Sequence, residues 1–156
     1  MKIFSRLAAT LLCGTMILGL GCAAKNSASA NRLMTPPGTV DADAPTEFSS
    51  TTTGLKYRVL RKGTGTKPTD RNMVTVNYQG WLDNGTVFDS SYDRGEPATF
   101  GLREVIPGWT EGLQLVAEGG LIELQIPSDL GYGPSGTQGI PGNSTLHFYV
   151  ELLKVQ

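Results

Sequence analysis

The chain has 156 residues, of which 39% are hydrophobic, and its 13 basic and 14 acidic side chains give a formal charge of −1. This length suits one domain of ordinary size better than two. The near-neutral charge offers no basic surface of the kind that binds phosphate backbones, so nucleic acid is not expected as a partner.

The N-terminal segment has the pattern of an export signal. Lys2 and Arg6 precede an apolar run over residues 7–20, which is too short to be a convincing membrane-spanning helix. The run ends next to Cys22, and a small residue before a cysteine resembles the cleavage box of bacterial lipoproteins. We therefore expect a lipoprotein-type signal peptide at residues 1–21. A lipid on Cys22 then anchors the exported protein to a membrane, facing the periplasm or the cell exterior.

Two further observations bear on this prediction. Gly19 stands where the lipoprotein pattern prefers a branched aliphatic residue, so ordinary secretion with cleavage after Ala30 is the alternative. The only cysteines are Cys13, inside the presumed signal, and Cys22. No intrachain disulfide is then available, and lipidation protects the one remaining thiol in an oxidising compartment. Without residues 1–21 the chain has 11 basic and 14 acidic side chains, a formal charge of −3.

Residues 22–53 are predicted to form a flexible tether. Their composition is dominated by Ala, Ser, Thr, Pro and Asn, with no sustained periodicity. A flexible chain of about 30 residues spans roughly 30 Å, enough to hold a domain clear of a membrane surface. The alternative is that part of this segment, near Phe48, adds an edge strand to the domain.

From residue 54 onward, alternation of apolar and polar residues predicts strands, and one Asn-Gly pair predicts a hairpin. One short helix is expected to begin near Trp109, with Thr110 or Gly108 as its cap, and to end before Gly119. A helix of about two turns is not stable alone, so we expect it to pack on the sheet. The predicted strands cover residues 55–61, 73–82, 87–91, 98–102, 121–127 and 145–155.

These elements predict an α+β domain over residues 54–156. An antiparallel sheet of five or six strands is expected to curve around the one short helix. At this size a single hydrophobic core is sufficient.

The domain lacks the residues for most catalytic chemistry. His147 is the only histidine, and it is expected to face solvent on the last strand, so neither a transition-metal site nor a Ser-His-Asp triad is predicted. No glycine-rich nucleotide motif opens a helix, and residues 63–68 are better explained as a turn than as a phosphate loop. No metal and no cofactor are therefore expected.

What remains is a group of apolar and aromatic side chains beside turns. A generic core explains any one of them, but a buried tyrosine needs a hydrogen-bond partner, and Asp89 is the nearest candidate acceptor. A tryptophan at the start of a short helix is the least expected member. The group comprises Tyr78, Phe88, Val105, Ile106, Trp109, Tyr132, Ile140 and Phe148.

Four stretches together carry a resemblance to a known family. They are VNYQGWLDNGTVFDSS (76–91), VIPGWTEGLQL (105–115), IPSDLGYGPSG (126–136) and IPGNSTLHFYVELL (140–153). Their order and spacing resemble the FKBP-type peptidyl-prolyl cis-trans isomerases, especially the exported bacterial members. The resemblance covers about residues 54–156.

This resemblance implies a shallow apolar pocket that holds a proline ring. It places Trp109 at the floor of the pocket and Ile140 at one closing side. The walls and rim that it implies are Tyr78, Phe88, Phe148, Val105 and Ile106.

The resemblance also implies which polar groups act on the substrate. The backbone N–H of Ile106 and the hydroxyl of Tyr132 are expected to bond substrate carbonyls. Asp89 is expected to bond the Tyr78 hydroxyl and to present its polar edge to the twisting amide. Tyr78, Asp89, Ile106 and Tyr132 are thus the expected catalytic set.

The activity implied is prolyl isomerisation of exported polypeptides as they fold, performed by a monomer. The alternative is a non-catalytic module that holds proline-bearing segments as a chaperone or adaptor. A third possibility, a purely structural envelope lipoprotein, does not explain why these pocket residues occur together. Two departures, Ala98 where some relatives carry an aromatic residue and the loop at 134–142, bear on substrate preference and inhibitor affinity more than on activity.

Overall fold

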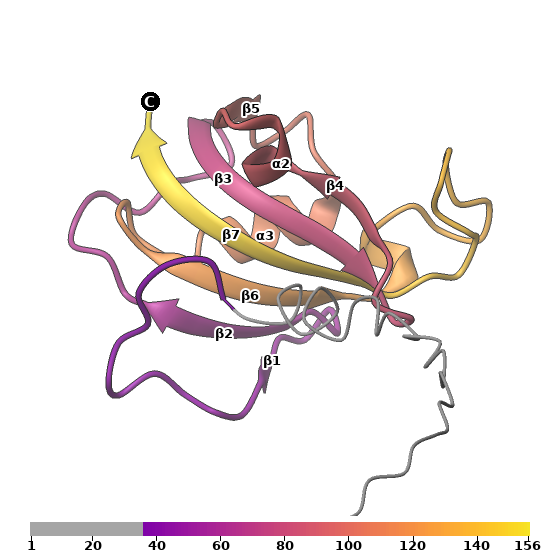
Figure 1. Cartoon of the computed structure of the whole chain (residues 1–156), viewed down its shortest axis with the longest axis horizontal. Helices are drawn as coiled ribbons and strands as arrows, with labels where there is room; N and C mark the ends of the chain where they lie inside the picture. Colours follow the sequence, from indigo (N-terminus) through magenta and orange to yellow (C-terminus); the bar gives the residue numbers. More distant parts are fainter. Residues whose placement is uncertain (1–35) are drawn as a thin grey trace, which may run out of the picture.

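The computed structural model describes residues 36–156 (Figure 1). The predicted signal peptide, Cys22 and the first part of the predicted tether lie outside the described residues. Within residues 36–156, no helix has the length and apolar character needed to cross a bilayer. The same residues contain no group of three or more His, Cys, Asp or Glu side chains arranged to hold a metal ion.

One antiparallel sheet organises the described chain. Its order is β1-β2-β6-β7-β3-β4, and β5 pairs with β3 beside β4. The predicted α+β class is confirmed, with one more strand than expected. The strands are β1 (Ser49–Ser50), β2 (Lys56–Arg61), β3 (Met73–Leu82), β4 (Val87–Ser90), β5 (Ala98–Gly101), β6 (Leu121–Ile126) and β7 (Leu146–Val155).

The longest strands, β3 and β7, pair along their whole length at the centre of the sheet. Alternate residues of each strand are buried, as the period of two in their sequences predicts. Tyr78 pairs with Val150 and Gly80 with Phe148, so the side chains that face the helix come from adjacent positions. This face, which we call the concave face, carries the main hydrophobic core.

The helix α3 (Pro107–Leu113) crosses the concave face (Figure 1). Its N-cap is Ile106, with no side-chain cap bond, so the prediction of Thr110 or Gly108 as the cap was wrong. Pro107 explains the start, because its fixed φ suits the first helical position and its missing N–H costs nothing there. The helix ends at Leu113, before Gly119 as expected. It lies so close to β6 that a Cβ at Gly108 would come within 2.5 Å of Ile126.

The opposite face of the sheet, here called the outer face, carries a second cluster of buried side chains: Leu60, Trp81, Leu121 and Tyr149. His147 lies on this face as expected, but it is not solvated. Its ring stacks on Trp81 with centroids 5.6 Å apart, its Nε2 lies 2.6 Å from Asp83 Oδ1, and its side chain is only 16% exposed. The tryptophan beside it accounts for this burial.

Residues 39–50, which we call the N-terminal strap, run along β2 instead of forming a free tether. The Asp41 N–H donates to the carbonyl of Leu60 at 2.8 Å, and Arg58 donates to the carbonyl of Thr46 at 2.8 Å. The guanidinium carbon of Arg58 lies 4.8 Å from the centroid of the Phe48 ring. The strap ends in β1, which pairs with β2. The edge strand near Phe48 is therefore present.

Two short helical elements lie outside the expected pattern. They are α2 (Ser91–Arg94), directly after β4, and the 3₁₀ helix η1 (Ser128–Leu130), after β6. The N-cap of α2 is Ser90, whose hydroxyl accepts from the N–H of Asp93 at 3.2 Å, and its C-cap is Gly95 in the left-handed region. This capping chemistry holds a single turn that is too short to show a helical period.

Candidate active site

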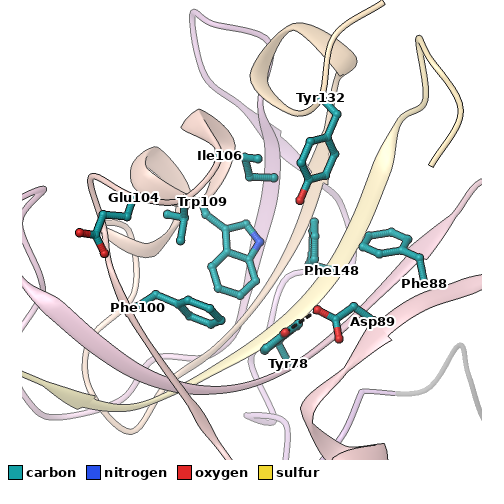
Figure 2. Close-up of a pocket in the computed structure, with 10 residues that line it drawn as sticks. Tyr78, Phe88, Asp89, Phe100, Glu104, Ile106, Trp109, Tyr132 and Phe148 are labelled. Carbon is teal, nitrogen blue, oxygen red and sulfur yellow. Dashed lines mark hydrogen bonds between the residues drawn. The ribbon is translucent and has the colours of Figure 1, made fainter. Parts of the chain in front are cut away.

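A cavity of about 290 Å³ opens on the concave face at the start of α3 (Figure 2). Such a volume lies at the small end of ligand pockets, which suits one ring rather than an extended molecule. It is formed where β3, β4, β5 and β7 meet the loop before α3 and the loop after η1. The lining residues are Tyr78, Phe88, Asp89, Phe100, Glu104, Val105, Ile106, Trp109, Tyr132 and Phe148.

Trp109 lies at the bottom of the cavity and is only 4% exposed. Its ring makes edge-to-face contacts with Tyr78 at 5.1 Å, Phe148 at 5.3 Å and Phe100 at 5.7 Å between centroids. The indole Nε1 has no hydrogen-bond partner among the described residues. The helix start therefore places a flat, rigid apolar surface beneath an open space, with one donor left unpaired.

Phe88 and Phe148 form the wall opposite the helix, with their ring centroids 5.5 Å apart at an interplanar angle of 85°. Both rings lie against the backbone of β3 at Gly80. A Cβ at that position would come within 2.6 Å of Phe148 Cε1 and 2.7 Å of Phe88 Cε2. Only glycine at this strand position allows the two rings to meet.

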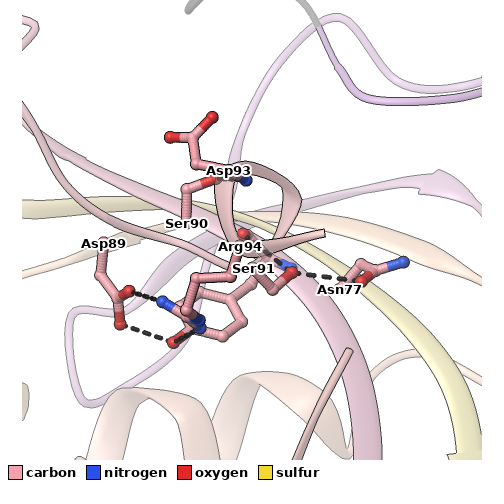
Figure 3. A network of polar contacts seen from close by, with 7 residues as sticks. Asn77, Asp89, Ser90, Ser91, Asp93 and Arg94 are labelled. Atoms are coloured by element: carbon pink, nitrogen blue, oxygen red, sulfur yellow. Dashed lines mark hydrogen bonds and ion pairs between the residues drawn. The ribbon is translucent and has the colours of Figure 1, made fainter. Parts of the chain in front are cut away.

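One edge of the cavity is polar (Figure 3). The Tyr78 hydroxyl donates to Asp89 Oδ2 at 2.5 Å. Arg94 donates to the other Asp89 oxygen and, at 2.9 Å, to the Tyr78 hydroxyl. Both carboxylate oxygens are thus engaged, so the orientation of Asp89 at the cavity edge is fixed by two partners.

The helix α2 places Arg94, and Ser91 attaches this helix to β3. The Ser91 side chain is fully buried, and its Oγ accepts from the backbone N–H of Tyr78 at 2.8 Å. The same hydroxyl lies 3.2 Å from Asn77 Oδ1, to which it can donate (Figure 3). The polar edge is therefore connected to the centre of the sheet through a single serine.

These contacts keep Asp89 ionised and Tyr78 protonated at neutral pH. Burial acts to raise the pKa of Asp89, but hydrogen bonds from Tyr78 and Arg94 outweigh it, and the pKa falls below its ordinary value of 3.8. Burial, followed by the bond to Asp89, raises the pKa of Tyr78 above its ordinary value of 10.0. The edge therefore presents a fixed negative charge that is partly neutralised by Arg94.

Two further donors at the cavity are unpaired. The backbone N–H of Ile106 and the hydroxyl of Tyr132 make no hydrogen bond within the described part of the chain. Tyr132 is 41% exposed, and Figure 2 shows its hydroxyl turned toward the space between Trp109 and Phe148. The cavity thus combines apolar walls with free donors, an arrangement that can bind carbonyl oxygens around an apolar ring.

The structure brings together every side chain expected at the pocket except Ile140. That residue is 6% exposed, belongs to the core, and forms an isolated bridge with Thr137 instead of lining the cavity. Three further residues at the site, Phe100, Glu104 and Arg94, were not predicted from the sequence. Phe100 lies on the same face of β5 as Ala98, so the period of two could have predicted it, whereas Arg94 depends on a four-residue helix that carries no periodic signal.

Comparison with known families identifies the family in which this arrangement occurs. A family model described as FKBP-type peptidyl-prolyl cis-trans isomerase matches residues 64–153, which carry the whole cavity. The chain belongs to this family. Its FKBP-type domain therefore accounts for the curved sheet, the short helix and the aromatic cavity together.

Similar proteins are found in several bacteria. The FKBP-type isomerase FkpA of Escherichia coli is 54% identical over 107 residues, which are 69% of this chain and 40% of FkpA. Outer membrane protein MIP of Legionella longbeachae is 49% identical over 104 residues, 66% of this chain and 45% of that protein. The crystal structure of E. coli FkpA superposes with a TM-score of 0.70 at 52% identity, covering 72% of this chain and 53% of that one. This chain thus spans less than half the length of these two relatives.

Proposed function

We propose that the protein catalyses cis-trans isomerisation of X-Pro peptide bonds in polypeptides. The supporting observation is the aromatic cavity, whose rim presents unpaired donors at Ile106 and Tyr132 and a fixed carboxylate at Asp89. The family membership supports the same activity. The reaction needs neither nucleophile nor general base, and the cavity lining contains no histidine, cysteine or lysine.

The chemistry follows from the amide. Rotation about the peptide bond has a barrier of about 18–20 kcal/mol for an ordinary amide because resonance is lost halfway. In the twisted state the carbonyl is less polar, so removal of water costs the planar state more than the twisted state. A cavity that holds the proline ring on Trp109 and binds the flanking carbonyls therefore favours the twisted geometry. Stabilisation by about 7 kcal/mol corresponds to roughly a 10⁵-fold acceleration.

Each residue has a distinct part in this proposal. Trp109, Phe88 and Phe148 hold the ring, and Val105 extends this apolar surface. The N–H of Ile106 and the hydroxyl of Tyr132 bind carbonyls on either side of the bond. Asp89, held by Tyr78 and Arg94, presents its charge to the rotating amide and interacts with its changing dipole.

The test is a protease-free isomerisation assay on residues 23–156 with several X-Pro peptides. We compare wild type with Asp89→Asn, which keeps the shape and removes the charge. Asp93→Asn is the matched control, because Asp93 is exposed on α2 and lies outside the cavity lining. We expect acceleration by wild type, a loss of about tenfold or more in Asp89→Asn, and full activity in Asp93→Asn.

Folding of each variant is checked by circular dichroism. A folded wild type that accelerates no peptide above the uncatalysed rate contradicts the proposal, and binding of the same peptides would then favour the chaperone or adaptor function. Equal losses in both variants would assign the effect to overall charge instead of to the polar edge.

We further propose that the protein is exported, that residues 1–21 are its signal peptide, and that Cys22 carries a lipid. The sequence pattern supports this, and the name of the Legionella relative places that protein at an outer membrane. Its partners are then proline-containing exported polypeptides. Mass spectrometry of the full-length protein expressed in a bacterium tests the proposal: a mature N-terminus at Cys22 with added acyl mass supports it, and cleavage after Ala30 supports secretion.

A further inference from the structure

We propose that Glu104 makes the site selective for proline segments that carry a basic side chain close to the proline. The inference rests on the proposed isomerase activity and specifies its substrate class. It concerns a residue that no part of the sequence pattern singled out, and it depends on how charge is distributed around the cavity.

Two carboxylates line the cavity, and only one of them is compensated. The charge of Asp89 is met by Arg94 and by the Tyr78 hydroxyl. Glu104 is exposed, and within the described residues its side chain makes no ion pair or hydrogen bond. Its Oε2 lies beside the end of β5: a Cβ atom, if Gly101 had one, would be 3.0 Å from it. Figure 2 shows it on the side of the cavity away from Asp89.

The cation closest in sequence to this carboxylate, Arg103, is already engaged. Arg103 donates to Asp70 through Nε at 3.1 Å and Nη2 at 2.8 Å. The cavity lining contains no lysine or arginine. The next acid along the chain, Glu111, accepts from the Thr53 hydroxyl at 2.7 Å and adds a second negative charge on this side of α3. The rim near Glu104 is therefore negative.

A bound peptide brings its side chains past this rim. A chain with its proline ring in the cavity advances about 3.3 Å per residue, so the residues beside the proline lie at the cavity mouth. A lysine or arginine there can approach Glu104, and a glutamate there meets a like charge. Exposed ion pairs of this kind change affinity by about 1.5- to 5-fold, and salt weakens them.

The test measures kcat/KM for three otherwise identical peptides with Lys, Gln or Glu next to the proline. The readout is the ratio of the Lys peptide to the Glu peptide, in low salt and in high salt. For wild type we expect a ratio of about 3 to 10 that falls toward 1 in high salt. Glu104→Gln should lower the ratio about threefold, and Glu104→Lys should invert it.

The matched control is Glu96→Gln. Glu96 is exposed, lies after α2 outside the cavity lining, and makes no side-chain hydrogen bond or ion pair within residues 36–156. The substitution removes the same charge at a different place, so it measures how far the net charge of the domain alone changes the Lys to Glu ratio. We expect it to leave the Lys to Glu ratio at the wild-type value.

The outcomes separate the two proposals. If wild type accelerates the Gln peptide but treats the Lys and Glu peptides alike, this inference is overturned and the isomerase activity stands. If Glu96→Gln lowers the ratio as much as Glu104→Gln does, selectivity belongs to net charge and the assignment to Glu104 is wrong. If no peptide is accelerated, the isomerase activity fails and the inference fails with it.

Discussion

The two faces of the sheet carry similar aromatic clusters, but they differ in whether their polar groups have hydrogen-bond partners. On the outer face, His147 bonds Asp83, and the nearly buried carboxylate of Glu123 accepts from Arg58 at 2.6 Å. On the concave face, the Trp109 indole N–H and the Tyr132 hydroxyl have no hydrogen-bond partner among residues 36–156. Each face buries a tryptophan that is 4% exposed.

This difference indicates that the outer face serves stability and that the concave face serves binding. A buried donor without an acceptor costs about 1–3 kcal/mol. The outer face avoids this cost, because its charged groups hold one another and the N-terminal strap. The concave face retains this cost at the Trp109 indole N–H, whereas its exposed Tyr132 hydroxyl is available to a ligand that supplies a carbonyl oxygen.

The sharpest test of this comparison uses the two buried tryptophans. Trp109→Ala and Trp81→Ala should each lower the free energy of unfolding by about 3–5 kcal/mol. Only Trp109→Ala should lower kcat/KM per folded molecule, by about 100-fold, because it removes the surface beneath the proline ring. Urea denaturation and the isomerisation assay measure the two effects. Phenylalanine variants replace any alanine variant that does not fold, and equal activity losses would contradict the division between the faces.

Removal of the N-terminal strap should affect stability alone. A chain that begins at residue 54 loses the acceptors of Arg58 and Arg61 on the strap, among them the Thr39 carbonyl at 3.0 Å. Compared with a chain that begins at residue 36, we expect a loss of about 1–3 kcal/mol in unfolding free energy. Catalysis should stay within twofold. Equal midpoints in urea for the two chains would show that the strap contributes nothing.

A pair of tyrosines gives a smaller contrast. Tyr132→Phe should lower kcat/KM by about three- to tenfold and change stability by less than about 0.5 kcal/mol, because the residue is exposed and its hydroxyl bonds no other group in the described part of the chain. Tyr149→Phe should do the reverse. That hydroxyl is buried near Glu123 and Arg58, and burial, followed by the Glu123 charge, raises its pKa to about 12. Its loss should cost about 1 kcal/mol.

The smallest expected effect is that the stability contributions of Asp89 on the concave face and Glu123 on the outer face change in opposite directions with pH. The pKa of Asp89 is lowered, so its contribution to stability is present above pH 3.8 and is lost as the pH falls below that value. Burial raises the pKa of Glu123 above 4.5 against the opposing bond from Arg58. The folded state therefore binds the Glu123 proton more tightly, and stability falls as the pH rises from 4.5 through the raised pKa.

Unfolding free energies of wild type, Asp89→Asn and Glu123→Gln between pH 2.5 and 7 check these slopes. Subtraction of each variant from wild type isolates one carboxyl group. A difference curve for Glu123→Gln that rises with pH would show that Arg58 outweighs burial at this position.

The sequence predicted the concave face better than the outer face. Alternation in the last strand placed His147 on the face opposite the core, and the resemblance to the FKBP family implied the cavity above Trp109. Alternation assigns a residue to a face of the strand but does not report what covers that face. His147 was therefore placed on the correct side and wrongly expected to be solvated, because its cover is Trp81 from a neighbouring strand.

The other differences between prediction and structure have similar causes. Ile140 lies in a loop, where no period indicates whether a side chain points into the cavity or into the core. Arg94 belongs to one helical turn defined by its Ser90 and Gly95 caps. The edge strand of the strap was expected only as the alternative to a free tether, because β1 consists of two serines and its attachment depends on arginines of β2 that are distant in sequence.

Gly80 has a consequence for how this site can change. Its missing side chain lets Phe88 and Phe148 meet above the strand, and even one methyl group there would collide with both rings. The cavity can therefore be enlarged by shortening either phenylalanine, but it cannot be reshaped from the strand beneath them. A glycine in a strand interior is unfavourable by roughly 0.5–1 kcal/mol. An engineer who replaced it to gain that stability would displace the two rings that form this wall of the cavity.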